Sequence, residues 1–323
     1  MKKIIVSTIT VLIILTLSFF SIYLGGFNLT TNQIATLKML GIVCVVSILF
    51  CFIVGEITRN NSQMDKLWSI LPVAYCWIMA GFGGFKLRLI IIALIVTLWG
   101  IRLTFNFARK GAYKLKFWEG EEDYRWKILR TKKPFTNKFV WALFDLFFIS
   151  IYQNLLVLVM TLPMLVVMES NLKVDALDAI PILAALGFLF LEYLADEEQW
   201  YFQETKKAKL AEGKTLAELD SPFNLGFNTT GLWSRMRHPN YLGEQGFWLS
   251  LYLFVIVTNQ ATYGIFNWSI IGPLLIVLLF MGSSTLGEKI SKSKYPKYRD
   301  YQQKVFKYLP FRKYEPKEEE KVC

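Results

Sequence analysis

One apolar run, LIIIALIVTLWGIRLTFNF at residues 89–107, decides the fold class of this chain. It carries one charged residue in nineteen, and an α-helix needs about 20 mainly apolar residues to cross the hydrocarbon core of a bilayer. Seven other segments share this character. The eight predicted spans are 4–24, 39–55, 67–85, 89–107, 139–167, 180–194, 241–257 and 265–281.

The composition indicates the same class. Of the 323 residues, 54% are hydrophobic and 16% are aromatic, which is more than the core of a soluble domain usually requires. We therefore predict an all-α protein, a polytopic transmembrane helix bundle of about eight spans. The first span follows Met1, Lys2 and Lys3 as a secretory signal would, but its apolar run is too long and no small-residue cleavage site follows. We expect it to remain as a helix.

The distribution of lysine and arginine predicts the orientation of the spans, because positively charged loops stay in the cytoplasm. Ten basic residues lie between Arg109 and Lys138, and further groups follow the sixth and eighth spans. The segments 168–179 and 258–266 together carry one basic residue. Eight spans with both the N and C termini in the cytoplasm satisfy all these loops, and only Lys86 and Arg88 oppose the arrangement.

The net charge of +11 is therefore first a signal of topology. Attraction to anionic membrane lipids is its second consequence. The basic residues are spread over separate loops with no recognised nucleic-acid-binding motif around them, so we do not expect nucleic acid as a partner.

Cysteine and glycine patterns exclude several kinds of site. The four cysteines, Cys44, Cys51, Cys76 and Cys323, form neither a disulfide framework nor a metal motif. Cys44 and Cys51 lie seven apart on one helix face, which favours packing over redox chemistry. No phosphate loop and no Gly-rich strand–helix unit occurs, so a Rossmann domain is excluded and membrane helices with their cytoplasmic loops must hold any nucleotide cofactor.

The segment GLWSRMRHPNYLGE at residues 231–244 concentrates polar chemistry between apolar runs and holds the only histidine. Pro239 biases the residue before it away from helix, so the next helix is expected to begin there. Its first residues include Asn240, Tyr241 and Glu244, and the basic residues before it are Arg235, Arg237 and His238. Basic side chains beside the N-terminus of a helix suit a phosphate or carboxylate. A structural Arg–Glu pair that caps the helix is the alternative.

Two more clusters lie near predicted helix ends. Arg102, Asn106 and Arg109 recur at three- and four-residue spacing and share one helix face. Arg102 lies deeper and needs a carboxylate or a phosphate, which its planar guanidinium binds with two hydrogen bonds. Asp65 lies near the start of the third span, where an acid is also favoured simply by the positive end of the helix dipole.

A third cluster forms a stripe where the sixth span leaves the membrane. Its members are Glu192, Asp196, Gln199 and Gln203. A hard-metal oxygen site is one interpretation and a solvated continuation of the helix is another. With one histidine in the chain, we predict no metal centre.

The basic segment after Met281 is expected either to lie on the membrane surface as an amphipathic helix or to form a lid over the site. In the second case Tyr298, Arg299 and Tyr301 would offer phosphate and stacking contacts.

Residues 231–244 resemble the signature of a bacterial membrane family of unknown function, related to steroid 5-alpha-reductases and more distantly to sterol reductases and isoprenylcysteine carboxyl methyltransferases. Five further pieces occur in the expected order: DKLW at 65–68, LWGIRL at 98–103, EEDYRW at 121–126, DEEQWYFQ at 196–203 and YPKYR at 295–299. We accordingly divide the chain into N-terminal transmembrane helices at 1–60, a steroid-reductase-like membrane domain at 61–311 and a charged tail at 312–323.

The resemblance implies a multi-pass protein of the bacterial inner membrane that binds NADPH within a helix bundle and takes a lipid-like substrate from the bilayer. On this basis the segment 240–244 contacts the cofactor, Asp196 resembles the acid that holds the adenosine end, and Arg102 and Arg299 resemble the basic residues around the phosphates. Asp65 is a stand-in for the catalytic acid. Trp99 occupies the place of the catalytic tyrosine, which is a departure from the steroid-reductase pattern.

The implied reaction is hydride transfer to an activated double bond, with Asp65 or Tyr241 donating a hydrogen bond as negative charge develops. Methyl transfer from S-adenosylmethionine is the main alternative, because the Arg-His-Pro-x-Tyr element also occurs in membrane methyltransferases. The long loop at 195–241 and the additional early helices favour the reductases. A non-catalytic lipid-binding bundle is the third interpretation.

Overall fold

The computed structural model describes residues 26–260 and 266–315, together with Leu12, Ile13, Thr16, Leu17, Phe19, Phe20 and Tyr23. Within these residues all regular secondary structure is helical, and one isolated β-bridge joins Met236 to Phe306. Five stretches are long and apolar enough to cross a membrane: Thr31–Thr58, Leu87–Ala108, Lys138–Val167, Ala176–Ala211 and Trp268–Lys294. The predicted class, an all-helical chain compatible with a multi-pass membrane protein, is confirmed. Most of the predicted span 4–24 lies outside the described residues.

The chain divides into two compact units, one made of Met1–Ala185 and Trp248–Ile276 and the other of Leu186–Phe247 and Val277–Cys323. We call them unit 1 and unit 2. The boundary falls within three helices, α10 (Ala179–Ala211), α11 (Pro239–Val257) and α12 (Ile271–Lys294). The predicted division at residue 60 is a different kind of boundary and stays a prediction.

In unit 1, α2 (Thr31–Thr58) is longer at both ends than the predicted span 39–55. The side chain of Thr30 accepts a hydrogen bond from the Gln33 backbone N–H, and the side chain of Gln33 accepts one from the Thr30 backbone N–H, so a capping box starts the helix early. Arg59, with φ of 58°, ends it in a left-handed conformation. Hydropathy located the apolar centre of this helix and missed its polar ends.

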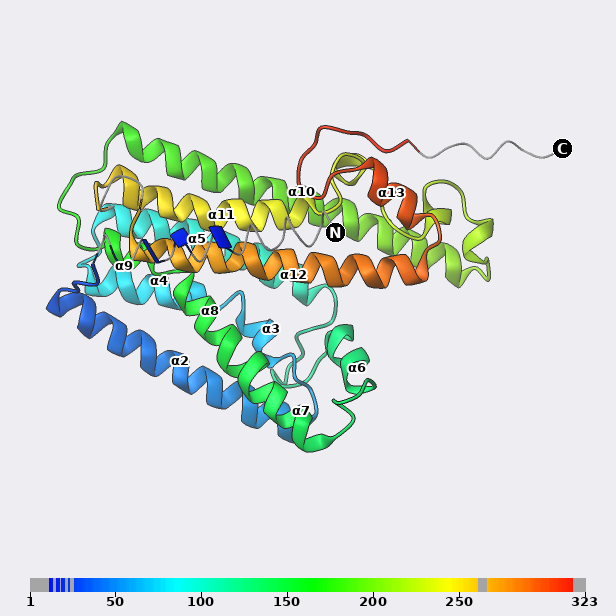
Figure 1. Ribbon diagram of the computed structural model, residues 1–323, viewed down its shortest axis with the longest axis horizontal. Helices are drawn as coiled ribbons and strands as arrows, with labels where there is room; N and C mark the ends of the chain where they lie inside the picture. Colours follow the sequence, from blue (N-terminus) through cyan, green and yellow to red (C-terminus); the bar gives the residue numbers. More distant parts are fainter. Residues whose placement is uncertain are drawn as a thin grey trace. The chain divides into compact units, whose positions relative to one another are not determined.

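The predicted third span, 67–85, is shorter in the structure and is divided in two. A five-residue helix α3 (Gln63–Leu67) precedes α4 (Leu71–Phe82), which has Pro72 in its first turn. Twelve residues make a helix of about 18 Å, less than the hydrocarbon thickness. Beside it runs α5 (Leu87–Ala108), which matches its prediction closely (Figure 1).

The predicted span 139–167 changes helical type along its length. The helix α6 (Tyr124–Arg130) precedes this stretch in the chain. Its parts are α7 (Lys138–Phe144), the π-helix η1 (Asp145–Tyr152), α8 (Gln153–Val159) and α9 (Pro163–Val167). A second short helix, the 3-10 turn η2 (Ala176–Asp178), precedes α10, and η6 (Trp268–Ile270) precedes α12. The stretch α7–η1–α8 packs against α2, green against blue in Figure 1.

Unit 2 shows the largest departures from the predicted ends. The prediction stopped the sixth span at residue 194 and the eighth at 281, but α10 continues to Ala211 and α12 to Lys294. Polar residues assigned to a loop or a tail therefore lie on long helices. Short helices complete the unit: η3 (Leu216–Glu218), η4 (Phe223–Leu225), η5 (Gly231–Ser234) and α13 (Tyr298–Lys304). The unit 2 parts of α10, α11 and α12 lie side by side (Figure 1).

Candidate functional site

The start of α11 organises the polar segment 231–244 in unit 2. The helix begins at Pro239, as predicted, and the His238 carbonyl accepts the backbone N–H of Leu242 at 3.1 Å. The backbone N–H groups of Arg237 and His238 donate to the carbonyls of Phe306 and Lys307, each at 3.1 Å. The chain entering α11 is thus fixed by a segment almost seventy positions later in the sequence.

Arg237 is a buried residue whose guanidinium is held by protein groups. Its Nε lies 2.7 Å from Oε1 of Glu288, and its Nη1 donates to the carbonyls of Gln302 and Val305. The Gln302 amide donates to the other Glu288 oxygen at 2.6 Å. Of the two interpretations of this cluster, the structural Arg–Glu pair is the one the geometry favours for Arg237, although the acid comes from α12 and not from α11.

His238 shares the same carboxylate, with its Nε2 3.1 Å from Glu288 Oε1. Burial lowers the pKa of His238, and the Glu288 carboxylate opposes the shift. The ring stacks on Tyr241 at 5.1 Å between centroids, and Tyr241 packs in turn on Phe280 at 4.6 Å. His238 is therefore a neutral, packed imidazole at neutral pH.

The predicted contacts in the C-terminal segment divide between core and surface. Tyr298 is buried with Leu225, Phe227, Tyr301, Val305 and Tyr314 in an aromatic cluster. The Tyr301 hydroxyl donates to the Trp233 carbonyl, which ties the segment 231–238 to α13. Arg299 and Arg235 are exposed. Packing explains Tyr298, whereas the two arginines have side chains available to an anion.

Helix α11 approaches α10 very closely. A Cβ added at Gly243 would lie 2.9 Å from the Phe188 carbonyl and 2.3 Å from Glu192 Cγ, and one at Gly246 would meet the Phe188 ring. Small residues let helix backbones approach in this way. Glu192 is buried, and Asp196 is half-buried on the same helix. In the described part of the chain, no group of three or more His, Cys, Asp or Glu side chains is placed to hold a metal ion.

Several buried hydrogen-bonding atoms of unit 2 have no partner among the described residues. They are Gln199 Oε1, Asn224 Oδ1, Thr229 Oγ1 and Asn240 Oδ1. Nearly all buried polar atoms in proteins are paired, so unpaired ones require an explanation. Gln199 and Asn240 lie on α10 and α11, the two helices brought together at Gly243. Glu244 is buried on the same stretch of α11.

In unit 1, Asp65 lies on α3 and contacts α6. Its Oδ2 accepts a hydrogen bond from Trp126 Nε1 at 3.0 Å, and Arg125 lies 3.9 Å from its Oδ1. Burial raises the pKa of Asp65, and the Arg125 guanidinium opposes the shift. The fold therefore joins the sequence pieces DKLW and EEDYRW, a contact that the sequence analysis did not predict.

Arg102, Asn106 and Arg109 share a face of α5, as predicted. Asn106 is buried and accepts hydrogen bonds from Nε and Nη2 of Arg109 at 3.0 and 2.8 Å. Arg102 is half-buried. Trp99, in the place expected for a catalytic tyrosine, is fully buried with its ring 4.9 Å from that of Trp248. It is a core residue of unit 1.

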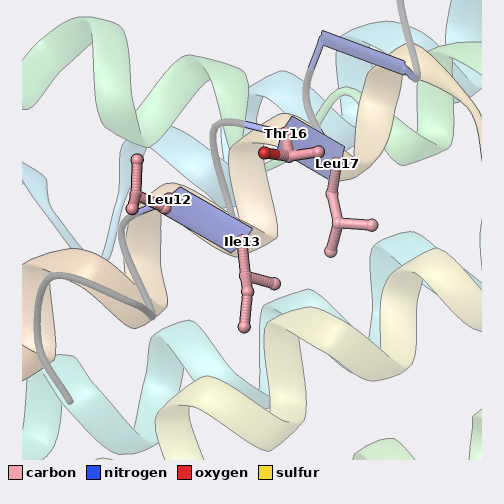
Figure 2. Close-up of a pocket in the computed structure, with 4 residues that line it drawn as sticks. All are labelled: Leu12, Ile13, Thr16 and Leu17. Carbon is pink, nitrogen blue, oxygen red and sulfur yellow. The ribbon is translucent and has the colours of Figure 1, made fainter.

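One surface pocket lies on the N-terminal segment of unit 1. Its lining consists of Leu12, Ile13, Thr16 and Leu17 (Figure 2). Three of these side chains are aliphatic, the Thr16 hydroxyl is the one polar group, and none of the four residues belongs to the predicted site.

The comparisons with known proteins identify the family. The model of a protein family of unknown function, DUF1295, matches residues 51–305. The chain belongs to this family. An uncharacterized protein of the fission yeast Schizosaccharomyces pombe is 38% identical over 283 residues, which cover 82% of this chain and 79% of the yeast protein. No solved structure matches the chain.

Membership of DUF1295 confirms the predicted family of unknown function, and the relative described above comes from a yeast, so the bacterial origin stays a prediction. The matched range contains Asp65, Arg102, the segment 231–244 and Glu288. The relation to steroid 5-alpha-reductases stays a prediction.

Two residues of this DUF1295 chain were missed by the sequence reasoning. Glu288 is the only acid between Glu244 and Asp300, and this isolation within a basic region was the available signal. Lys66 is fully buried, and its Nζ donates to the carbonyls of Phe117 and Glu119 at 2.7 and 2.6 Å. Burial lowers the pKa of Lys66 to about 8. The sequence around Lys66 does not distinguish this residue from the exposed lysines of the chain.

Proposed function

We propose that this DUF1295 protein is a membrane reductase that binds NADPH and reduces an activated double bond of a lipid- or steroid-like substrate taken from the bilayer. The observation that carries the proposal is the pair of buried acceptors without a partner in the described chain, Gln199 Oε1 and Asn240 Oδ1. An NADPH molecule offers matching donors in its carboxamide, its adenine amino group and its ribose hydroxyls. Leaving such acceptors buried and unpaired is costly, and a bound donor removes the cost.

Different residues of unit 2 would contact different parts of NADPH. Gln199 and Asn240 accept hydrogen bonds, and the exposed Arg235 and Arg299 bind phosphate. On the resemblance, Asp196 holds the adenosine end and Tyr241 and Glu244 line the inner wall. Arg237 and His238 act indirectly, because their contacts with Glu288 fix the start of α11.

NADPH supplies the hydride when bound, and the chain must supply a hydrogen-bond donor for the developing negative charge. Asp65 is the proposed donor. Burial raises its pKa, so it retains its proton to a higher pH than an exposed aspartate does. Its place in the reaction, like that of Arg102, rests on the resemblance.

A second candidate function is methyl transfer from S-adenosylmethionine. Its adenosine and amino group also offer donors to Gln199 and Asn240, so these two acceptors do not separate the cofactors. The two exposed arginines favour NADPH, because its phosphates offer several anionic groups whereas S-adenosylmethionine offers a single carboxylate. A lipid-binding bundle without catalysis is the third candidate.

Calorimetric titration of the purified protein with NADPH and with S-adenosylmethionine tests the proposal. NADPH should bind, and Arg299→Ala should weaken it by about tenfold through loss of a charge-assisted hydrogen bond. Arg312→Ala, which removes another exposed arginine of the C-terminal segment, is the matched control and should leave the affinity unchanged. Clearly tighter binding of S-adenosylmethionine than of NADPH would overturn the proposed reductase. Binding of neither cofactor would favour the lipid-binding bundle.

We also propose eight spans with both termini in the cytoplasm, in the inner membrane of a bacterium. The support is the alternation of basic and uncharged loops along the chain. The short α4 would supply one span in this arrangement, and the predicted span 4–24 lies mostly outside the described residues.

A further inference from the structure

A row of buried polar residues lies within unit 1, where most of a membrane protein's interior is apolar. The buried face of α2 carries Cys44, Ser47, Cys51 and Gly55 at three- and four-residue spacing. The stretch η1–α8 packs on this face and adds Asp145, Ser150 and Asn154, all buried. We call these seven residues, with Glu56 and Asn61 at one end, the polar row.

Several contacts connect the two sides of the polar row. Asn154 Nδ2 lies 3.8 Å from Cys51 Sγ, and Ser150 Oγ lies 3.5 Å from Asp145 Oδ1. A Cβ added at Gly55 would be 3.4 Å from Asp145 Oδ2 and 3.1 Å from Asn61 Nδ2. The absence of a side chain at Gly55 therefore makes the room in which Asp145 and Asn61 approach α2. The π-helix begins at Asp145, and such turns are frequent at functional sites.

Five atoms of the polar row are buried with no hydrogen-bond partner among the residues the structure describes. They are Ser47 Oγ, Glu56 Oε1, Asn61 Nδ2, Asp145 Oδ2 and Asn154 Oδ1. Asp145 is 1% exposed and Asn154 is fully buried. So many unpaired polar atoms in one place indicate that something small and polar fills the space between them.

Charged groups from two helices surround Asp145. Glu56 on α2, Arg130 on α6 and Cys51 on α2 act on it, with neutral Asn61 and Ser150 in contact range. Arg130 is itself bound to Glu122 and Asn61. Glu56 pairs through its other oxygen with the exposed Arg59 at 3.7 Å, so one end of the row reaches the surface. Among the described residues, Asp145 thus faces a second carboxylate and forms no ion pair.

The length of the row decides which ligand fits. Ser47 and Glu56 are nine residues apart on one helix, about 14 Å. Oxygen ligands spread over that distance cannot surround one cation, whereas water molecules, each making about three hydrogen bonds, fit a line of separate acceptors and donors. An acid in such a row is a proton site, because ionisable groups inside membranes are costly unless they serve a function.

We propose that Asp145 binds and releases a proton through ordered water that fills the polar row. A proton delivered by water from the Glu56 end bonds to Asp145 Oδ2 and converts the carboxylate to the carboxylic acid, and release reverses this step. The site lies wholly within unit 1 and requires no cofactor. The proton site can therefore be tested independently of the proposed reductase.

Infrared titration of the full-length protein in lipid nanodiscs tests the proposal, because a protonated carboxyl group has a carbonyl band that an ionised one lacks. Wild type should show this band disappearing as the pH rises, and Asp145→Asn should remove one titrating component. Asp178→Asn is the control, since Asp178 is equally buried in unit 1 but paired with Arg88 at 2.6 Å. Asp65→Asn identifies any component that belongs to Asp65.

Glu56→Gln gives a second readout that does not require the Asp145 variant to fold. Removing the neighbouring negative charge should shift the midpoint of the Asp145 component to lower pH. A spectrum in which Asp145→Asn retains every titrating component would overturn the proposal. An unshifted midpoint in Glu56→Gln would do the same.

Discussion

Glu288 holds the chain before α11 in place by accepting from three side chains, those of Arg237, His238 and Gln302. All but Gln302 are buried or nearly so, and losing the acid would leave the Arg237 guanidinium buried without its counter-charge. The sequence predicted the polar cluster and the helix start at Pro239 from local signals. It did not predict Glu288, because a partner fifty positions away leaves no periodic pattern in the chain.

His238 gives a test at the residue scale, since it is the only histidine. Its folded pKa lies below the ordinary 6.5, so the folded state binds fewer protons than the unfolded state between these values. The contribution of neutral His238 to stability is present above pH 6.5 and is lost as the pH falls toward the folded pKa. Thermal unfolding of wild type and His238→Gln should therefore show a difference that shrinks on acidification from pH 7.5 to 5. A difference independent of pH would contradict this account.

Helix ends show what local pattern does and does not determine. The apolar runs predicted where α5 and α11 lie, because long stretches of one character have few alternatives in a membrane. They did not predict that α10 and α12 continue into polar sequence, since hydropathy marks the end of the apolar run and not of the hydrogen-bonded helix. The close approach of α11 to α10 was not predicted either, because it depends on which faces of the two helices pack together.

The contact at Gly243 is testable at the scale of these helices. Gly243→Ala places a methyl group against the backbone of α10 and should destabilise the protein by about 1–3 kcal/mol. Gly187→Ala is the matched control on α10. Nothing lies within 4 Å of its Cβ position, so it should stabilise the helix by about 0.5–1 kcal/mol. Equal melting temperatures for the two variants would show that the close approach has no energetic weight.

At the scale of the whole molecule, charge distribution predicts which loops face the cytoplasm. Lys114 precedes α6, Lys173 precedes α10 and Lys214 follows it, and all three are exposed. Cysteines introduced singly at these positions, with Cys323 replaced by serine, should be separable with a membrane-impermeant maleimide. The cysteine at 173 should react in intact cells, and those at 114 and 214 only after permeabilisation. Cys44, Cys51 and Cys76 are buried and should give little background. The reverse labelling pattern would invert the proposed orientation.

The proposed reductase requires that the unpaired acceptors of unit 2 bind a cofactor, and the Gln199→Met variant tests this requirement. Methionine has similar size but lacks the buried acceptor, so the unliganded variant should be more stable than wild type by about 1 kcal/mol. The same variant should bind NADPH about tenfold more weakly, because one hydrogen bond to the cofactor is lost. Gln203→Met, one turn further along α10, should change neither quantity. A Gln199→Met variant that gains stability and still binds NADPH with wild-type affinity would contradict the claim.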